Sequence, residues 1–124
     1  MNILAIIPAR GGSKGIPHKN IQKLAGKPLI YYSINSAKIS KCFNKIIVST
    51  DDEKIAKISK GFGAEVPFLR PKNISKDSSS TIEVIKHTLE FLKKNQNYIP
   101  DIIIVLQPTS PLRTLNLIKS GKYT

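Results

Sequence analysis

The chain has 124 residues, of which 40% are hydrophobic, and this size suits one domain with a modest core rather than two domains. Its 20 Lys and Arg residues against 8 Asp and Glu residues give a net charge of +12, which favours anionic partners such as nucleotides, acidic sugars or nucleic acid. No run approaches the ~18 consecutive apolar residues of a membrane helix, and the first residues lack a signal-peptide pattern, so we expect a soluble cytoplasmic protein.

Neither the charge nor the cysteine content selects a function. Many of the lysines fall where the solvated faces of helices are expected, so the excess of positive charge does not identify a partner. The single cysteine, Cys42, excludes an internal disulfide and suits a reducing cytoplasm, and we expect it to be a small buried residue.

Four strands are expected along the chain. The runs at residues 3–7, 46–48 and 102–106 are short and rich in β-branched residues or leucine. A weaker strand is expected at residues 64–68, where Pro67 lacks a ladder donor and belongs at a sheet edge.

Helical patterns separate these strands. The first helix is expected at about residues 28–39, with Pro28 in its first turn. Asp51 or Asp52 can cap the second helix. Ser80-Thr81-Ile82-Glu83 has the form of a capping box and begins the third.

The resulting order, β-α-β-α-β-α-β, predicts an α/β fold of three layers, Rossmann-like, with a mostly parallel sheet. In such sheets ligands bind beyond the carboxyl ends of the strands, where the strand order reverses. With the four strands in the order 3-2-1-4, the loops at residues 8–20 and 107–113 would face each other across a binding cleft.

The first of these loops carries three glycines and three cations within a short stretch, which suits a polyphosphate. Its glycines, Gly11, Gly12 and Gly15, do not have the spacing of the dinucleotide fingerprint or of a Walker A loop. A flexible connection with surface lysines is the alternative interpretation.

Three stretches resemble one known family, the acylneuraminate cytidylyltransferases or CMP-sialic acid synthetases. They are residues 7–20 (IPARGGSKGIPHKN), residues 47–51 (IVSTD) and residues 106–113 (LQPTSPLR). The resemblance covers residues 2–115. It implies a nucleotidyltransferase fold and an enzyme that joins CTP to a nine-carbon sugar acid, releasing pyrophosphate with the help of Mg²⁺. Relatives acting on legionaminic or pseudaminic acid share these motifs, so the sugar stays open.

The resemblance also implies roles for individual residues. Catalytic roles at the phosphates fall to Arg10, Lys14 and Lys19. Gln107 would contact the sugar acid. The residues implied on the CTP side are Arg10, Gly11, Gly12, Ser13, Lys14, Asn20, Arg70, Ser79 and Thr81. An ion pair of Arg70 with Asp77, together with helix capping by Ser80, is the alternative for the segment assigned to cytidine.

Other polar residues carry weaker interpretations. His18 is expected to face solvent, and His87 to be structural or on the surface. Asp51 could touch a ligand or metal, although helix capping is the better interpretation. The sequence has no closely spaced set of His, Cys and carboxylate residues that would indicate a metal site.

Compared with the family pattern, the chain is short. We expect one partial domain, residues 1–124, with residues 115–124 as an aberrant or truncated end. The family's Mg²⁺-binding aspartates and the segment that pairs two subunits into a homodimer would lie beyond it. The strand at residues 102–106 would then be an exposed edge that favours self-association. A non-catalytic nucleotide-binding fragment needing a complementary chain is the alternative function, and nucleic acid is not an expected partner because a reading motif is missing.

Overall fold

The computed structural model describes residues 1–11, 23–24, 26–71, 81–107 and 116–119. The elements, in chain order, are β1 (Ile3–Pro8), β2 (Lys23–Leu24), β3 (Lys27–Pro28), α1 (Leu29–Ser40), β4 (Lys45–Ser49), α2 (Glu53–Gly61), α3 (Thr81–Gln96), β5 (Ile102–Val105) and β6 (Asn116–Lys119).

The main sheet has the order β4-β1-β5-β6. β1 pairs in parallel with β4, from Leu4 opposite Lys45 to Pro8 opposite Ser49, and in parallel with β5 on its other side. The expected fourth strand, at residues 64–68, is reduced to a single parallel bridge between Ile47 and Glu65. The predicted order 3-2-1-4 is therefore confirmed, with its outermost member shortened because Pro67 cannot donate to a ladder.

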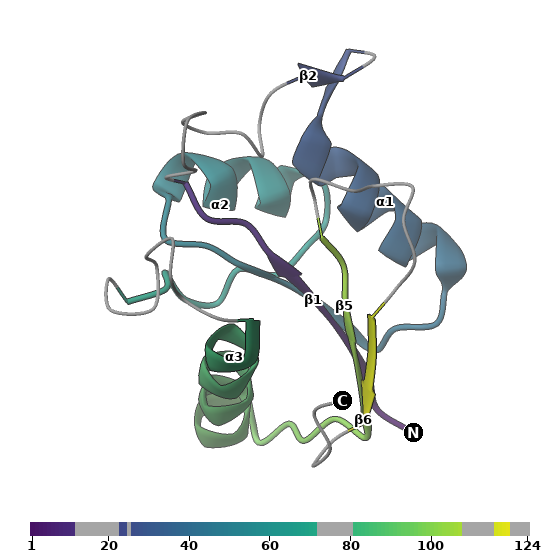
Figure 1. Ribbon diagram of the computed structural model, residues 1–124, viewed down its shortest axis with the longest axis vertical. Coiled ribbons are helices and arrows are strands. Elements are labelled where there is room, and N and C mark those ends of the chain that lie inside the picture. The colour runs from purple at the N-terminus through teal and green to yellow at the C-terminus, as the bar shows by residue number, and fades with distance from the viewer. Residues whose placement is uncertain (12–22, 25, 72–80, 108–115, 120–124) are drawn as a thin grey trace.

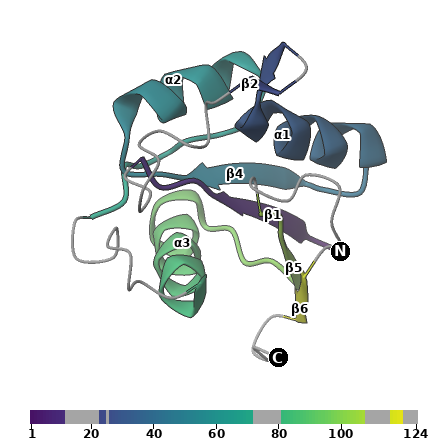
Figure 2. The ribbon, with the colours of Figure 1, turned by 45° about the horizontal axis from the view of Figure 1, so that its top comes forward.

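Helices cover both faces of this sheet. α1 and α2 lie together on one side and α3 lies on the other (Figures 1 and 2). Alternate residues of β1 point to opposite faces, so Ala5 and Ile7 pack under α1 and α2, while Leu4 and Ile6 pack against α3. Because β1 is buried on both faces, its near-continuous apolar run is typical of a central parallel strand.

The three predicted helices are confirmed, with differences at their ends. Pro28 is the N-cap residue of α1 rather than a member of its first turn. Asp52 caps α2, since its side chain accepts from the backbone N–H groups of Lys54 and Ile55. α1 ends at Lys41 in the left-handed conformation, with φ of 56°. The capping residue proposed for α3, Ser80, lies outside the described residues.

Two expectations are wrong. Cys42 is exposed rather than buried, because it lies in the connection between α1 and β4, just after the left-handed Lys41 that ends the helix. β5 is not an edge strand, because β6 pairs with it antiparallel from Asn116 opposite Val105 to Lys119 opposite Ile102. Four of the residues expected to form an aberrant end thus belong to the sheet.

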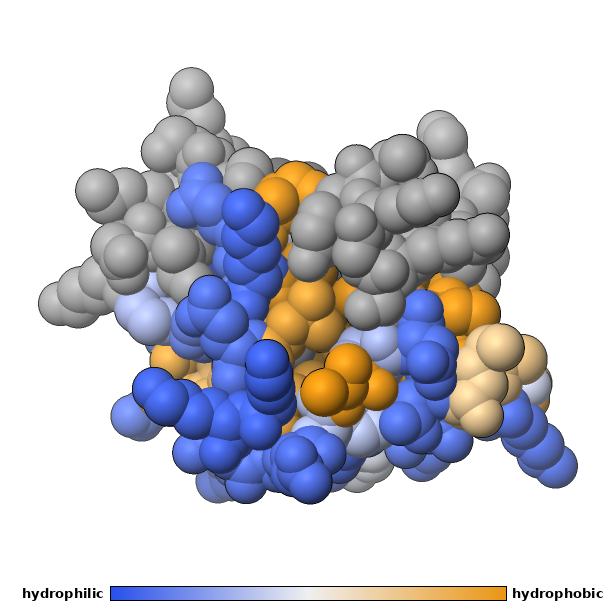
Figure 3. Space-filling view, turned by 90° about the horizontal axis from the view of Figure 1, so that it is seen from below, coloured by the Kyte–Doolittle hydropathy of each residue, from blue (hydrophilic) through white to orange (hydrophobic). Residues whose placement is uncertain are grey.

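A short antiparallel pair, β2 with β3, was not expected and forms a separate sheet before α1. On the face seen from below in Figure 3, hydrophilic residues predominate and hydrophobic ones show between them in smaller patches. Among the described residues, no helix has the length and apolar character to cross a membrane.

Candidate functional site

The sheet brings three of the predicted site segments to one edge. Arg10 and Gly11 follow β1 after one residue, Ala9, and Gln107 follows β5 after one residue, Leu106. Hydrogen bonds continue the ladders beyond the strands: Ala9 N–H donates to Ser49 O over 2.9 Å, and Leu106 N–H donates to Ile6 O over 3.0 Å. The carboxyl ends of β1, β4 and β5 therefore lie side by side, where parallel α/β sheets bind ligands.

Arg70 lies at this edge as a buried residue, only 6% exposed. Its backbone N–H donates to Thr50 O over 2.7 Å, which ties it to the end of β4. Its guanidinium donates twice to Ser49: from Nε to Oγ over 3.1 Å and from Nη2 to the main-chain O over 2.6 Å. Two bonds from a planar group fix its orientation as well as its position.

The electrostatic surroundings of Arg70 identify its neighbours. Burial lowers its pKa below the ordinary value of an arginine, the carboxylate of Asp51 acts in the opposite direction, and the charge of Arg10 lowers the pKa further. Arg10 and Arg70, which come from distant parts of the sequence, thus lie close enough to repel each other. The structure places together two cations that the family pattern assigns to CTP.

Asp51 has a contact that the sequence did not reveal. Its Oδ1 accepts a hydrogen bond from the backbone N–H of Gly11 over 2.8 Å. The expectation that Asp51 caps a helix is wrong, because the neighbouring Asp52 is the cap. A carboxylate bound to a backbone N–H resembles a helix cap in chemistry, but here it holds the first glycine of the glycine-rich loop.

Gly11 is needed for the close approach of this loop to α2. A Cβ atom at Gly11 would lie 2.6 Å from both Cβ and Oδ2 of Asp52. Real side chains do not tolerate such distances, so only glycine lets the backbone pass the N-terminus of α2 here. The glycine predicted to approach a phosphate is also required by packing within the protein.

The other predicted residues divide into two groups. Gln107 is partly buried beside the end of β1, and Thr81 is exposed at the first position of α3. Several lie outside the described residues, and their roles stay predictions: Gly12, Ser13, Lys14, Lys19, Asn20 and Ser79. Asp77, the alternative partner of Arg70, and His18 also lie outside them.

Sequence reasoning missed Ser49 and the contact of Asp51 with the loop. Both belong to the stretch IVSTD, which carried part of the family resemblance, but their partners are far along the chain. Ser49 and Arg70 are separated by 21 positions, and Gly11 and Asp51 by 40. No periodic pattern could have indicated these contacts, although the position of a serine and an aspartate at the end of a strand was a signal of polar function.

His87 lies behind the site, on α3. Its ring packs edge-on against Phe68, with centroids 4.6 Å apart, and its Nδ1 is buried without a hydrogen-bond partner. Burial lowers the pKa of His87, the charge of Arg70 lowers it further, and Glu90 opposes both effects. These contacts agree with the structural interpretation of this histidine.

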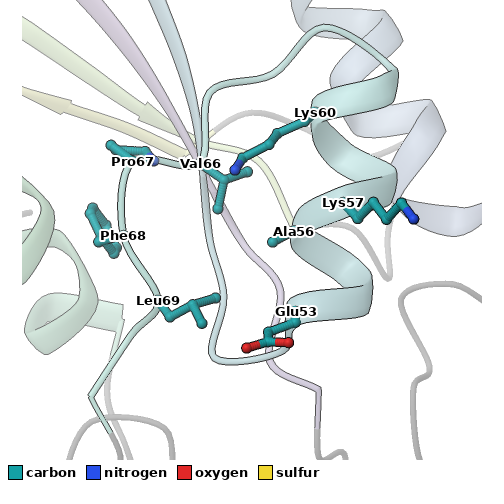
Figure 4. A pocket seen from close by; sticks show the side chains of 8 residues that line it. All are labelled: Glu53, Ala56, Lys57, Lys60, Val66, Pro67, Phe68 and Leu69. Atoms are coloured by element: carbon teal, nitrogen blue, oxygen red, sulfur yellow. The ribbon is translucent and has the colours of Figure 1, made fainter.

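A pocket of about 350 Å³ lies beside the site rather than in it (Figure 4). It is formed between α2 and the segment from Val66 to Leu69, and Lys60 reaches toward Val66 while Lys57 extends away from it. Its lining contains neither Arg10, Gly11, Arg70 nor Gln107. The described residues of the predicted site therefore do not contribute to this pocket.

Within the described part of the chain, no group of three or more His, Cys, Asp and Glu side chains could hold a metal ion. Asp51 and Asp52, the two carboxylates at this edge, are already engaged by backbone N–H groups. A Mg²⁺ ion usually binds through one or two carboxylates together with substrate phosphates and water.

Comparison with known proteins places this geometry in context. Residues 4–120 match the family described as cytidylyltransferase. The pseudaminic acid cytidylyltransferase of Campylobacter jejuni (serotype O:23/36) is 46% identical over 121 residues, which cover 98% of this chain and 52% of that protein. The CMP-N,N'-diacetyllegionaminic acid synthase of Legionella pneumophila is 45% identical over 91% of this chain and 48% of that protein. The chain thus spans about half the length of these curated relatives.

A solved structure supports the same assignment. The structure of CMP:2-keto-3-deoxy-manno-octonic acid synthetase in complex with CTP superposes with a TM-score of 0.71 at 25% identity, over 91% of this chain and 42% of that one. The sheet order and the two helical layers agree with the predicted nucleotidyltransferase fold. The chain belongs to the cytidylyltransferase family.

Proposed function

We propose that this chain binds CTP at the carboxyl ends of β1 and β4 and contributes to the transfer of CMP to a nine-carbon sugar acid. The observation that carries the proposal is the convergence of Arg10, Gly11 and Arg70 at one edge of the sheet. Arg10 and Gly11 begin the loop that the family pattern assigns to the triphosphate, and Arg70 begins the segment it assigns to cytidine.

In the proposed reaction the anomeric hydroxyl of the sugar acid attacks the α-phosphorus of CTP and loses its proton. An oxygen–phosphorus bond forms at that atom as the bond to the bridging oxygen of pyrophosphate breaks. Catalysis of this kind depends on placing both reactants in line and neutralising charge on the leaving group. Arg10 can donate two parallel hydrogen bonds to phosphate oxygens, and Lys14 and Lys19 would add point charges.

Arg70 is proposed to recognise cytosine. A guanidinium presents up to five donors and no acceptor, which matches the O2 and N3 acceptors of the base. Because Ser49 accepts from Nε and Nη2, the orientation of the guanidinium is set by the protein before a base arrives. A fixed donor loses less entropy on binding than a free side chain.

Three related sugar acids are candidates for the second substrate. The two curated relatives named above carry pseudaminic and diacetyllegionaminic acid in their names, and N-acetylneuraminate is the third candidate from the motif resemblance. Gln107, beside the end of β1, is proposed to face this substrate. Mg²⁺ is proposed to enter with the phosphates of CTP, and the cytoplasm is the proposed location.

Titration of the purified chain with CTP, UTP and inorganic triphosphate, by calorimetry and thermal unfolding, tests the binding proposal. CTP should bind more tightly than UTP, and Arg70→Ala should reduce that preference. Equal affinity for CTP and UTP would contradict recognition of the base by Arg70. Pyrophosphate release with Mg²⁺ and each of the three sugar acids in turn tests the transfer step.

The second candidate is a nucleotide-binding unit that is active only with a complementary chain. The observation behind it is that the chain spans 52% and 48% of the two curated relatives named above. It predicts stabilisation by CTP without pyrophosphate release. Homodimer formation, which the resemblance implies for the family, is tested by sedimentation of the same sample.

A further inference from the structure

We propose that Asp51 is a positioning residue, which holds the start of the glycine-rich loop and the guanidinium of Arg70 in one fixed arrangement for CTP. The inference deepens the proposed function and rests on it. It assigns a role to a residue at which the sequence pattern pointed only to helix capping or to contact with a ligand or metal.

The first contact of Asp51 is directed at the loop. Its Oδ1 accepts from Gly11 N–H over 2.8 Å, and this contact is partly buried. Gly11 is itself buried, and its backbone lies close to Asp52. Packing against Asp52 therefore prevents the Gly11 backbone from moving toward α2. The hydrogen bond from Gly11 N–H to Asp51 therefore fixes the direction in which the chain leaves β1.

The second influence of Asp51 is on Arg70. The carboxylate favours the charged guanidinium, whereas burial and the charge of Arg10 disfavour it. Ser49, two residues before Asp51, holds the same guanidinium through two hydrogen bonds. The end of β4 thus supplies both the acceptors and the negative charge that keep Arg70 in place.

The neighbouring acid shows that this role is separate from helix capping. Asp52 accepts from Lys54 N–H over 2.8 Å and from Ile55 N–H over 3.1 Å, which satisfies the N-terminus of α2. Asp51 is not needed for that purpose. The two adjacent carboxylates therefore have different partners: Asp52 caps α2, and Asp51 accepts a hydrogen bond from the glycine-rich loop.

A carboxylate beside a triphosphate site would be unfavourable if it faced the ligand alone. Here its negative charge acts on Arg70 in the direction opposite to that of Arg10, and its Oδ1 is engaged by Gly11 N–H. Without it, Arg10 and Arg70 would repel each other directly and Gly11 N–H would lose its acceptor. We expect Asp51 to act on CTP through these neighbours rather than by touching the phosphates.

The test compares Asp51→Ala and Asp51→Asn with a matched control at the other end of β1. There Asp101 Oδ2 accepts from Asn2 N–H over 2.7 Å, so Asp101→Ala removes the same kind of bond from the residue just before β1. CTP affinity is measured by calorimetry, thermal unfolding by calorimetry, and exchange of the Gly11 amide proton by NMR.

Asp51→Ala should weaken CTP binding about tenfold, a typical effect of losing one hydrogen bond and its charge. It should also speed exchange of the Gly11 amide. Asp51→Asn keeps an oxygen acceptor, so it should protect that amide nearly as well as wild type while weakening CTP binding by less than Asp51→Ala. Asp101→Ala should leave both readouts unchanged, whatever it does to the melting temperature.

Wild-type affinity for CTP in Asp51→Ala, or an equal loss in Asp101→Ala, would overturn the inference while the proposed function stands. If Asp51→Ala does not fold, Asp51→Asn decides, because unchanged CTP affinity in that variant would remove the role of the charge. Failure of the wild-type chain to bind CTP would instead overturn the proposed function, and the inference with it.

Discussion

The Nη2 atom of Arg70 donates to the main-chain oxygen of Ser49 over 2.6 Å, and its Nε donates to the hydroxyl of the same serine. Both residues are buried, with Ser49 fully so. A charged donor that loses its acceptor inside a protein carries a desolvation penalty that nothing offsets. Ser49 is therefore a means of burying an arginine at the edge of the sheet.

Ser49→Ala should lower the free energy of unfolding by about 1–3 kcal/mol, because Arg70 Nε would lose its acceptor. Urea denaturation measures the difference. Ser40→Ala is the matched control, since Ser40 Oγ donates to Ala37 O over 2.7 Å but the residue is exposed. The control should change stability by less than about 0.5 kcal/mol. Equal effects of the two substitutions would contradict the special role of Ser49.

Gly11→Ala should destabilise the protein by about 1–3 kcal/mol, because the new Cβ would overlap Asp52 at 2.6 Å and force the backbone to move. Gly61→Ala is the control, because a Cβ there meets nothing within 4 Å and the residue lies at the end of a helix. That variant should be as stable as wild type or more stable by up to about 1 kcal/mol. Guanidinium denaturation of both variants provides the comparison.

Asp52→Ala should cost about 0.5–2 kcal/mol of stability, since two backbone N–H groups at the start of α2 would lose their acceptor. Asp52→Ser should restore most of the loss, because a serine hydroxyl accepts at the same position. Circular dichroism during thermal unfolding measures both variants. Similar stabilities of the alanine and serine variants would show that packing, rather than capping, sets the contribution of Asp52.

His87 should make the protein less stable in acid. Its pKa is lowered in the folded state, chiefly by burial, so the unfolded chain binds more protons below the ordinary histidine pKa of about 6.5. Its contribution is fully present above that pH and is lost as the pH falls through the lower folded value.

Urea unfolding of wild type and His87→Phe between pH 5 and pH 8 measures this contribution. The phenylalanine keeps a ring against Phe68 but cannot bind a proton. The stability of wild type relative to the variant should therefore decrease as the pH falls through this window. Parallel curves for the two proteins would show that His87 does not titrate differently in the folded and unfolded states.

The sheet could be predicted because its central strands depend on local composition. The runs from Ile3 to Ile7 and from Ile102 to Leu106 are apolar enough to be buried on both faces, and helices between parallel strands restrict the order to a few arrangements. β6 and the β2–β3 pair could not be predicted in this way. Each is only two to four residues long, and pairing with a neighbour, rather than any pattern of their own, defines them.

The site was predicted by motif and not by geometry. Arg10 and Arg70 were singled out, and they do lie close together, but the pattern contained no information about what holds Arg70. Its partner Ser49 is fixed by the alignment of the segment after Leu69 with the end of β4, which is a tertiary property. The prediction that Cys42 is buried failed for a related reason. The composition around it does not show that α1 ends at the left-handed Lys41 and leaves Cys42 in an exposed connection.

β1 lies between two parallel neighbours, with helices above and below (Figure 2), and residues 9–11 continue the chain from it. Separating β1 from its neighbours would require the whole sheet to open, so its amides should exchange only by global unfolding. A ligand that binds to residues joined to this strand would be released by global unfolding, so its binding would oppose unfolding. Its binding would then raise the melting temperature of the entire chain as one cooperative unit, by an amount set by its concentration and dissociation constant.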